Sequence, residues 1–164
     1  MVIGKTETVE KSGDLNLLPF RRALEGQALY VGITGATDSR GGTERMGNAA
    51  LAALHARGAK VGRSSRIPAR PFLISAMEQA ALQTSMLVPV KRAIEAALLG
   101  KQPASLQDAG RIAASGVKAY FTAGNAWERN APYTVQQKGF DMPLIRTGTL
   151  RNAITYRTEA GGGG

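Results

Sequence analysis

Residues 65–77 read SRIPARPFLISAM, and two prolines constrain the backbone inside this stretch. Pro68 and Pro71 restrict their own φ angles, and each disfavours helical angles at the residue before it. Ile67 and Arg70 are therefore expected to be extended, and Pro71 suits the first position of a helix. We expect this turn to set the angle at which the following helix leaves.

Four arginines lie in or beside segments of restricted conformation. Arg66 and Arg70 flank the prolines, and Arg146 and Arg151 flank the sequence TGTL. A guanidinium group is a rigid fork that suits carboxylates and phosphates, and a stiff backbone loses little entropy on docking. All four are therefore candidates for contact with a neighbouring subunit or partner. The alternatives are solvated charge for Arg66 and an internal ion pair for Arg70.

The composition removes several classes of chemistry. The chain has 164 residues, which suits one domain, and its 43% apolar content includes only 5% aromatic residues, so the core must be mainly aliphatic. It contains no cysteine and one histidine, His55, so disulfides, thiolate metal sites and a Ser–His–Asp triad lack their residues. We predict no catalytic, cofactor-binding or metal-binding residue and no enzymatic activity.

The formal net charge is +9, with 21 lysines and arginines against 12 acids. This balance indicates either solubility alone or contact with a polyanion or an acidic protein surface. The N-terminus is polar and shows no signal peptide, and the apolar stretch SMLVPV is too short to cross a bilayer. No membrane association is expected.

Residues 29–42, LYVGITGATDSRGG, resemble a strand followed by a dinucleotide-binding loop. The reductase variant of that fingerprint needs glycine where this chain has Ser39, and its helix must begin at once. Here the next helical pattern starts about ten residues later. A mobile loop is therefore favoured over a nucleotide site.

The remaining patterns predict an α+β fold. Strands are expected at 27–34, with Leu29, Val31 and Ile33 on one face, and at 152–159. Helices or helical turns are expected at 16–26, at 48–57 with Asn48 as cap, Gly58 as terminator and Leu51, Leu54, Ala50 and Ala53 facing inward, at 71–86, at 89–100 because Pro89 should break or restart the helix, at 106–124, at 134–137 and at 150–152. The apolar face of the 106–124 helix is expected to consist of Leu106, Ala109, Ile112, Ala113, Val117, Tyr120 and Phe121. Residues 59–66 are expected to form a basic loop.

These elements indicate a small antiparallel sheet, built from the N- and C-terminal strands and packed with a central group of helices. We predict a flexible N-terminal segment at 1–15, a single α+β domain at 16–158 and a flexible glycine-rich tail at 159–164. Because two strands alone are marginal, further strand must come from the loops, the N-terminal segment or another subunit.

Several motifs occur together in a characteristic order. They are VGI at 31–33, LAALHARGA at 51–59, IPARPFL at 67–73 and KGFDMPLIRTGTLRNAITYR at 138–157. In this order and spacing the chain resembles the tailed-phage virion-morphogenesis family, the tail-completion or neck proteins of Mu-like and lambdoid phages. The resemblance covers roughly residues 29–157. Its structural motif residues are here Pro68, Pro71, Phe72, Gly148 and Leu150.

The resemblance implies a structural, non-enzymatic virion protein at the head–tail junction, assembled in the host bacterial cytoplasm. Such a protein would form a ring, expected to be a hexamer, contact other neck and tail proteins, and touch DNA passing through the ring without reading its sequence. This chain departs from the family at Ala56–Gly58, often EFG, at Arg146, usually Asp, and at Ala153, commonly Ser. These changes make that surface more basic. The alternative function is a basic, non-specific nucleic-acid-binding module.

Overall fold

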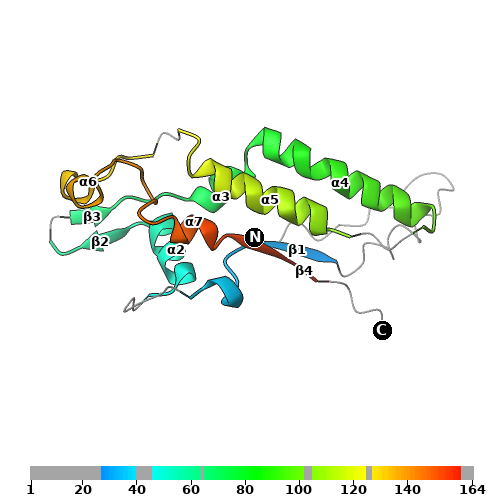
Figure 1. Cartoon of the computed structure of the whole chain (residues 1–164), viewed down its shortest axis with the longest axis horizontal. Helices are drawn as coiled ribbons and strands as arrows, with labels where there is room; N and C mark the ends of the chain where they lie inside the picture. Colours follow the sequence, from blue (N-terminus) through cyan, green and yellow to red (C-terminus); the bar gives the residue numbers. More distant parts are fainter. Residues whose placement is uncertain (1–26, 40–45, 64, 102–104, 125–126, 160–164) are drawn as a thin grey trace.

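The computed structural model describes residues 27–39, 46–63, 65–101, 105–124 and 127–159 (Figure 1). The elements in these ranges are β1 (Ala28–Gly32), the 3-10 helix η1 (Gly35–Thr37), α2 (Asn48–Arg57), β2 (Ala59–Val61), β3 (Ser65–Ile67), α3 (Phe72–Met77), α4 (Ala80–Leu98), α5 (Gln107–Tyr120), α6 (Pro132–Lys138), α7 (Thr149–Asn152) and β4 (Thr155–Glu159). The helix expected at 16–26 and the flexible segment expected at 1–15 lie outside the described residues.

The first and last strands pair as expected. β1 and β4 run antiparallel, with Ala28 opposite Glu159 and Gly32 opposite Thr155. This pairing joins the two ends of the described chain and confirms the α+β class with a small sheet. β4 continues through Glu159, so the tail expected from 159 onward begins one residue too early. Ladder hydrogen bonds hold this last residue in the strand.

Helix α5 lies between α4 and the sheet of β1 and β4 (Figure 1). Its buried positions are mostly small and share one face, namely Ala109, Gly110, Ala113, Ala114 and Val117. Small side chains let the sheet approach the helix backbone, and Gly110 lies directly against Tyr156 and Leu29. The predicted apolar face of this helix is therefore the central surface on which the other elements pack.

The predicted helix break at Pro89 is wrong. The helix breaks earlier, at Glu78 and Gln79, and α4 continues through Pro89. Proline inside a helix removes one donor and clashes with the carbonyl four residues earlier, at a cost of about 3 kcal/mol, and α4 forms despite this cost while it packs along α5. The earlier break has a tertiary cause, because α3 buries Phe72 against the C-terminal part of α5, while α4 places Leu82 against Gly116 and then runs back along α5.

The basic loop expected at 59–66 is also wrong, because β2 and β3 form a second antiparallel ribbon there. Ala59 lies opposite Ile67, Lys60 opposite Arg66 and Val61 opposite Ser65. Three-residue strands are too short to show an alternating pattern in sequence. The ribbon is a separate sheet, so within the described residues it adds no strand to the sheet of β1 and β4.

The N-terminus of helix α2 is capped by a side chain that lies well before the helix in sequence. Its N-cap is Gly47 rather than Asn48, and the Asp38 carboxylate accepts a hydrogen bond of 2.6 Å from the Ala49 amide. Asn48 is buried, and its side-chain amide donates to the carbonyl oxygens of Thr37 at 2.9 Å and Ser39 at 3.1 Å. This aspartate lies 11 residues before the amide that it caps, so no local pattern reveals it.

The inward face of α2 differs from the expected one. Ala50 and Ala53 are exposed, whereas Leu51 and Ala52 pack against the core. The helix ends as expected at Arg57, and Gly58 follows with φ +72°. Only glycine adopts such an angle without strain.

Near the C-terminus, α6 begins at Pro132 and is longer than the single turn expected, because Pro132 suits the first position of a helix. The short turn expected at 150–152 is confirmed as α7, which Gly148 precedes with φ +78°. Within the part of the chain that the structure describes, none of the helices has the length and apolar character needed to span a membrane.

Substituting Gly110 tests the close packing of α5 on the sheet. A Cβ at this position would lie 2.3 Å from a ring carbon of Tyr156 and 2.9 Å from a methyl carbon of Leu29. Gly110→Ala should therefore lower the free energy of unfolding by about 1–3 kcal/mol, even though alanine has a higher intrinsic helix propensity than glycine. Urea denaturation measures the change. The control Ser115→Ala, at an exposed position of the same helix, should be neutral or slightly stabilising. A stabilised Gly110→Ala would contradict this packing.

Candidate functional site

The proline-containing segment is fixed against the end of α2. The Arg70 amide donates a 2.7 Å hydrogen bond to the carbonyl oxygen of His55 in the last turn of that helix. A Cβ at Gly58 would lie 2.7 Å from the Ile67 carbonyl oxygen and 2.9 Å from the Ala69 nitrogen. Glycine is therefore required for its left-handed φ and because two backbone segments meet here.

The Arg70 side chain points into the protein and is only 4% exposed. Its guanidinium donates to the Glu128 carbonyl oxygen from Nη2 at 2.7 Å and from Nε at 3.3 Å, and to the Arg129 carbonyl oxygen from Nη2 at 3.4 Å. Burial lowers the pKa of Arg70, while the carboxylates of Glu128 and Asp141 act in the opposite direction.

Arg70 was a candidate for contact with a neighbouring subunit, and its burial contradicts that role. The alternative, an internal ion pair, is correct in that Arg70 binds within its own chain. Its hydrogen bonds, however, go to backbone carbonyl groups rather than to a carboxylate. Backbone carbonyls that are removed from water need a donor, and a guanidinium can serve several of them at once.

Arg66 lies at the surface and pairs with the same segment. Its Nη2 is 2.8 Å from the Glu128 carboxylate, and the two side chains are 68% and 52% exposed. An exposed pair of this kind contributes at most about 1 kcal/mol to stability. Arg66 therefore remains available to a partner.

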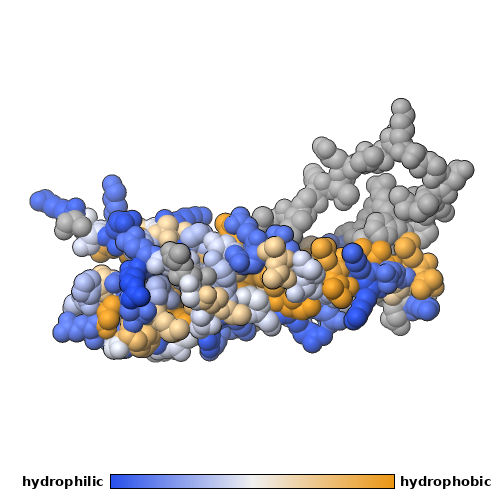
Figure 2. Space-filling view, turned by 90° about the horizontal axis from the view of Figure 1, so that it is seen from above, coloured by the Kyte–Doolittle hydropathy of each residue, from blue (hydrophilic) through white to orange (hydrophobic). Residues whose placement is uncertain are grey.

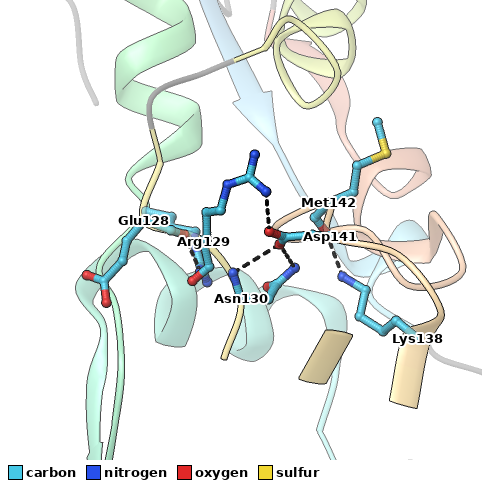
Figure 3. A network of polar contacts seen from close by, with 7 residues as sticks. Glu128, Arg129, Asn130, Lys138, Asp141 and Met142 are labelled. Atoms are coloured by element: carbon cyan, nitrogen blue, oxygen red, sulfur yellow. Dashed lines mark hydrogen bonds and ion pairs between the residues drawn. The ribbon is translucent and has the colours of Figure 1, made fainter. Parts of the chain in front are cut away.

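Asp141 fastens the other side of the 127–131 segment (Figure 3). Its carboxylate accepts hydrogen bonds from the Asn130 amide at 3.1 Å and the Asn130 side chain at 3.0 Å, and pairs with Arg129 at 2.9 Å. The backbone hydrogen bond from Asn130 lowers the pKa of Asp141, and Arg129 lowers it further. The carboxylate is therefore held in its ionised form.

Lys138 completes this polar region at the end of α6. Its Nζ donates to the Met142 carbonyl oxygen at 2.5 Å (Figure 3). Burial lowers the pKa of Lys138, and the nearby charges of Arg70 and Arg146 lower it further, against the opposing effect of Asp141. Arg146 is exposed and lies near this region.

Arg151, the fourth candidate arginine, forms its hydrogen bonds with the neighbouring residue. Arg151 in α7 is half-buried, and its Nε and Nη2 each donate to the Asn152 side-chain oxygen at 3.3 Å. The four arginines therefore do not form one surface. Arg66 and Arg70 meet through Glu128, Arg146 lies beside Lys138, and Arg151 is separate.

The motif residues are mainly structural. Phe72 and Leu150 are 2% and 5% exposed, and the rings of Phe72 and Phe121 have centroids 4.8 Å apart. Pro68 is half-buried, and Pro71 is the exposed N-cap of α3 rather than its first residue. Gly148 supplies the positive φ before α7.

The sequence interpretation missed the partners of this region, Glu128, Asn130 and Asp141. The only signal was the dense run of polar residues around Trp127 in an irregular stretch. Nothing in that run identifies residue 70, which lies 58 positions away from Glu128, as a hydrogen-bonding partner. Chemically, the arrangement is a polar lock between chain segments, which we call the Arg70 lock (Arg70, Glu128–Asn130 and Asp141).

Removing the Arg70 side chain should destabilise the fold. Arg70→Met keeps much of the aliphatic volume but leaves the carbonyl oxygens of Glu128 and Arg129 without this donor. We expect a loss of roughly 2–4 kcal/mol in the free energy of unfolding. The control Arg66→Met removes only an exposed pair and should cost less than about 1 kcal/mol. Equal effects of the two substitutions in urea denaturation would contradict the lock.

The Asp141 carboxylate predicts an acid-dependent contribution to stability. Its folded-state pKa is lowered from the ordinary value of 3.8, so the contribution is complete above that value and is lost as the pH falls through the folded pKa. Asp141→Asn should therefore melt at a lower temperature than the wild type at pH 7. The difference should shrink below pH 3.8. Calorimetry at several pH values measures it, and a difference that is constant with pH would contradict the assignment.

Comparison with known proteins finds no match, whether against family models, curated proteins or solved structures. Within the described ranges, no group of three or more His, Cys, Asp or Glu side chains is placed to hold a metal ion.

Proposed function

We propose that this chain is a structural protein of the head–tail junction of a tailed phage, acting by docking to copies of itself and to neighbouring neck or tail proteins. The observation that carries the proposal is that helix α4 extends past its packing partner α5 (Figure 1) and that large apolar side chains on and next to this helix are exposed. The motif resemblance supplies the biological setting.

The segments that carry the resemblance meet in the fold. Val31 in β1 lies opposite Tyr156 in β4, and the Arg70 amide binds the His55 carbonyl oxygen. Phe72 and Leu150 belong to one core cluster. Motifs that build the framework are expected of a protein that acts through its shape, so this convergence supports a structural role.

The exposed apolar surface lies mainly along α4. The helix faces α5 from Leu82, which lies against Gly116, as far as Arg92, which lines the same groove as Asp108. The helix then continues to Leu98 and extends past the end of α5 (Figure 1). We call the stretch from residue 93 to residue 99 the α4 arm.

Large apolar side chains are exposed on and beside this arm. Leu98 and Leu99 are 52% and 67% exposed, and Leu87 and Val88, earlier on the helix, are 52% and 48% exposed. Burying a side chain of this kind completely is worth about 1.5–3 kcal/mol. The occupant that we propose for this surface is a second copy of the chain.

A closed ring repeats one head-to-tail contact between two different surfaces of each subunit, and the α4 arm is proposed as one of these two surfaces. In the described part of the chain, β1 and β4 pair only with each other. Each strand therefore has an outer edge whose backbone groups can pair with another chain. The α4 arm and these edges are separate surfaces, as a ring subunit that also contacts other neck or tail proteins requires.

Substitutions of exposed leucines on the α4 arm and earlier on the same helix test the proposal. The double variant Leu87→Glu/Leu98→Glu should weaken self-association at least tenfold, about 1.4 kcal/mol, while circular dichroism shows an intact fold. Sedimentation velocity measures the association. The matched control is Val61→Glu on β2, which is 49% exposed but lies away from α4, and it should assemble like the wild type.

The second readout is the phage particle. Electron microscopy should place the wild-type protein between head and tail, and particles made with the double variant should show unjoined heads and tails. A wild-type chain that stays monomeric at high concentration and is absent from mature particles would overturn the proposal. So would normal, infectious particles made without the protein.

The second candidate function is nucleic-acid binding. It is favoured by one specific feature, the exposed basic ribbon of β2 and β3. The two functions are compatible in a collar through which DNA passes.

A further inference from the structure

The β2–β3 ribbon has an anchored base and an exposed tip. Ala59 and Ile67 at the base are half-buried, and Gly58 beneath them is in close contact with the proline-containing segment. Residues 60–63, 65 and 66, beyond the base, are exposed, and Gly62 turns the chain with φ +63°. The Arg70 lock holds the segment that follows β3. The ribbon is therefore a short projection on a fixed base, beside α6 at one end of the molecule (Figure 1).

The charge on this ribbon has one sign. From Arg57 to Ile67 the chain contains Arg57, Lys60, Arg63 and Arg66 and no aspartate or glutamate. Lys60 lies directly opposite Arg66, so their side chains share one face of the ribbon. Like charges placed opposite each other destabilise a pair of strands. Glu128 offsets only one of the two, through an exposed ion pair.

A second copy of the chain is a poor source of the missing negative charge. In the described ranges, Asp108, Glu128, Asp141 and Glu159 are already paired with arginines of the same chain, and the exposed acids without an ion pair are Glu78, after α3, and Glu95, in α4. The carboxylate of Asp38 is bound to the Ala49 amide. Glu78 and Glu95 are two isolated carboxylates, so the described part of a second copy offers the ribbon less negative charge than a polyanion does.

The shape of the ribbon favours duplex DNA among polyanions. The major groove of B-DNA admits a two-stranded antiparallel ribbon, whereas the major groove of duplex RNA is too narrow and deep for side chains to read. The ribbon carries no aromatic side chain on which unpaired bases can stack, which disfavours single strands. Its cations suit phosphate contacts, which position a protein on DNA without selecting a sequence.

We propose that the β2–β3 ribbon is a site for the phosphate backbone of double-stranded DNA, with Lys60 and Arg63 as its principal contacts and Arg66 as a third. The ribbon lies at the opposite end of the molecule from the α4 arm (Figure 1). Figure 2 shows a mainly hydrophilic surface at the ribbon end and the hydrophobic surface gathered toward the other half. The inference names the site of the DNA contact in the proposed function, but it rests on the geometry of the ribbon itself.

The test is binding of the full chain to a short DNA duplex of mixed sequence, followed by fluorescence anisotropy over a range of salt concentrations. The logarithm of the association constant should fall linearly with the logarithm of salt, by about 0.9 for each phosphate contacted. Lys60→Gln/Arg63→Gln should make this slope shallower by about 1.8. The matched control, Lys91→Gln/Lys101→Gln, removes the same charge from α4 and the residues after it, and should leave the slope nearly unchanged.

Three results would overturn the inference. The first is no binding of the wild type at low salt, and the second is an equal loss in both double variants, which would show an effect of net charge alone. The third is ribbon-dependent binding of poly-glutamate as tight as that of DNA, which would point to an acidic protein. Single-stranded DNA and duplex RNA should bind more weakly than duplex DNA.

The inference and the proposed function can fail separately. Sedimentation of Lys60→Gln/Arg63→Gln should match that of the wild type, because the ribbon is remote from the α4 arm. Lost DNA binding with intact assembly in this variant supports the ribbon site. A wild-type chain that does not assemble but binds duplex DNA through the ribbon would contradict the ring and support the site.

Discussion

The placement of one buried guanidinium constrains much of this molecule. The Arg70 side chain serves the carbonyl oxygens of Glu128 and Arg129, and its own amide binds the end of α2 at His55. Burying a guanidinium is costly unless its donors are satisfied, and unpaired backbone carbonyls are costly as well. The guanidinium and the carbonyl oxygens satisfy each other's hydrogen-bonding needs. Separating the three segments would therefore leave buried polar groups without partners. Proline on both sides of this region narrows the backbone choices that could avoid the arrangement.

The rest of the core contains few large side chains, and its helices and strands pack close together instead. Helix α5 presents alanine, glycine and valine, which bring the sheet and α4 near its backbone. Among the described residues, the ring–ring contacts gather at the C-terminal end of α5, where Phe72, Phe121 and Trp127 meet. A layer built in this way is thin, and it leaves much of α4 at the surface. In a chain that works alone, such exposed leucines are a liability, whereas in a subunit of an assembly they are a contact surface.

The two ends of the molecule therefore differ in the forces that they offer a partner. The α4 arm offers exposed apolar area, whose burial against a partner would not weaken as salt rises. The β2–β3 ribbon offers unbalanced positive charge on a fixed base, which attracts a polyanion and weakens as salt rises. The Arg70 lock lies between β3 and α6 and holds the second of these surfaces in place. A collar protein requires both kinds of contact on separate faces, and this separation underlies the functional proposal.

The sequence by itself determined the α+β class, the antiparallel pairing of the end strands, the apolar face of α5 and the extended conformation around Pro68. These features follow from local preferences and from short periodic patterns. The tertiary structure alone decided that Arg70 faces inward, that Asp38 caps α2, that the chain breaks at Glu78 rather than at Pro89, and that residues 59–67 pair as a ribbon. Each of these outcomes depends on a partner distant in sequence or on strands too short to show a period. A guanidinium between two prolines looks the same in sequence whether carbonyl groups or water will receive its hydrogen bonds.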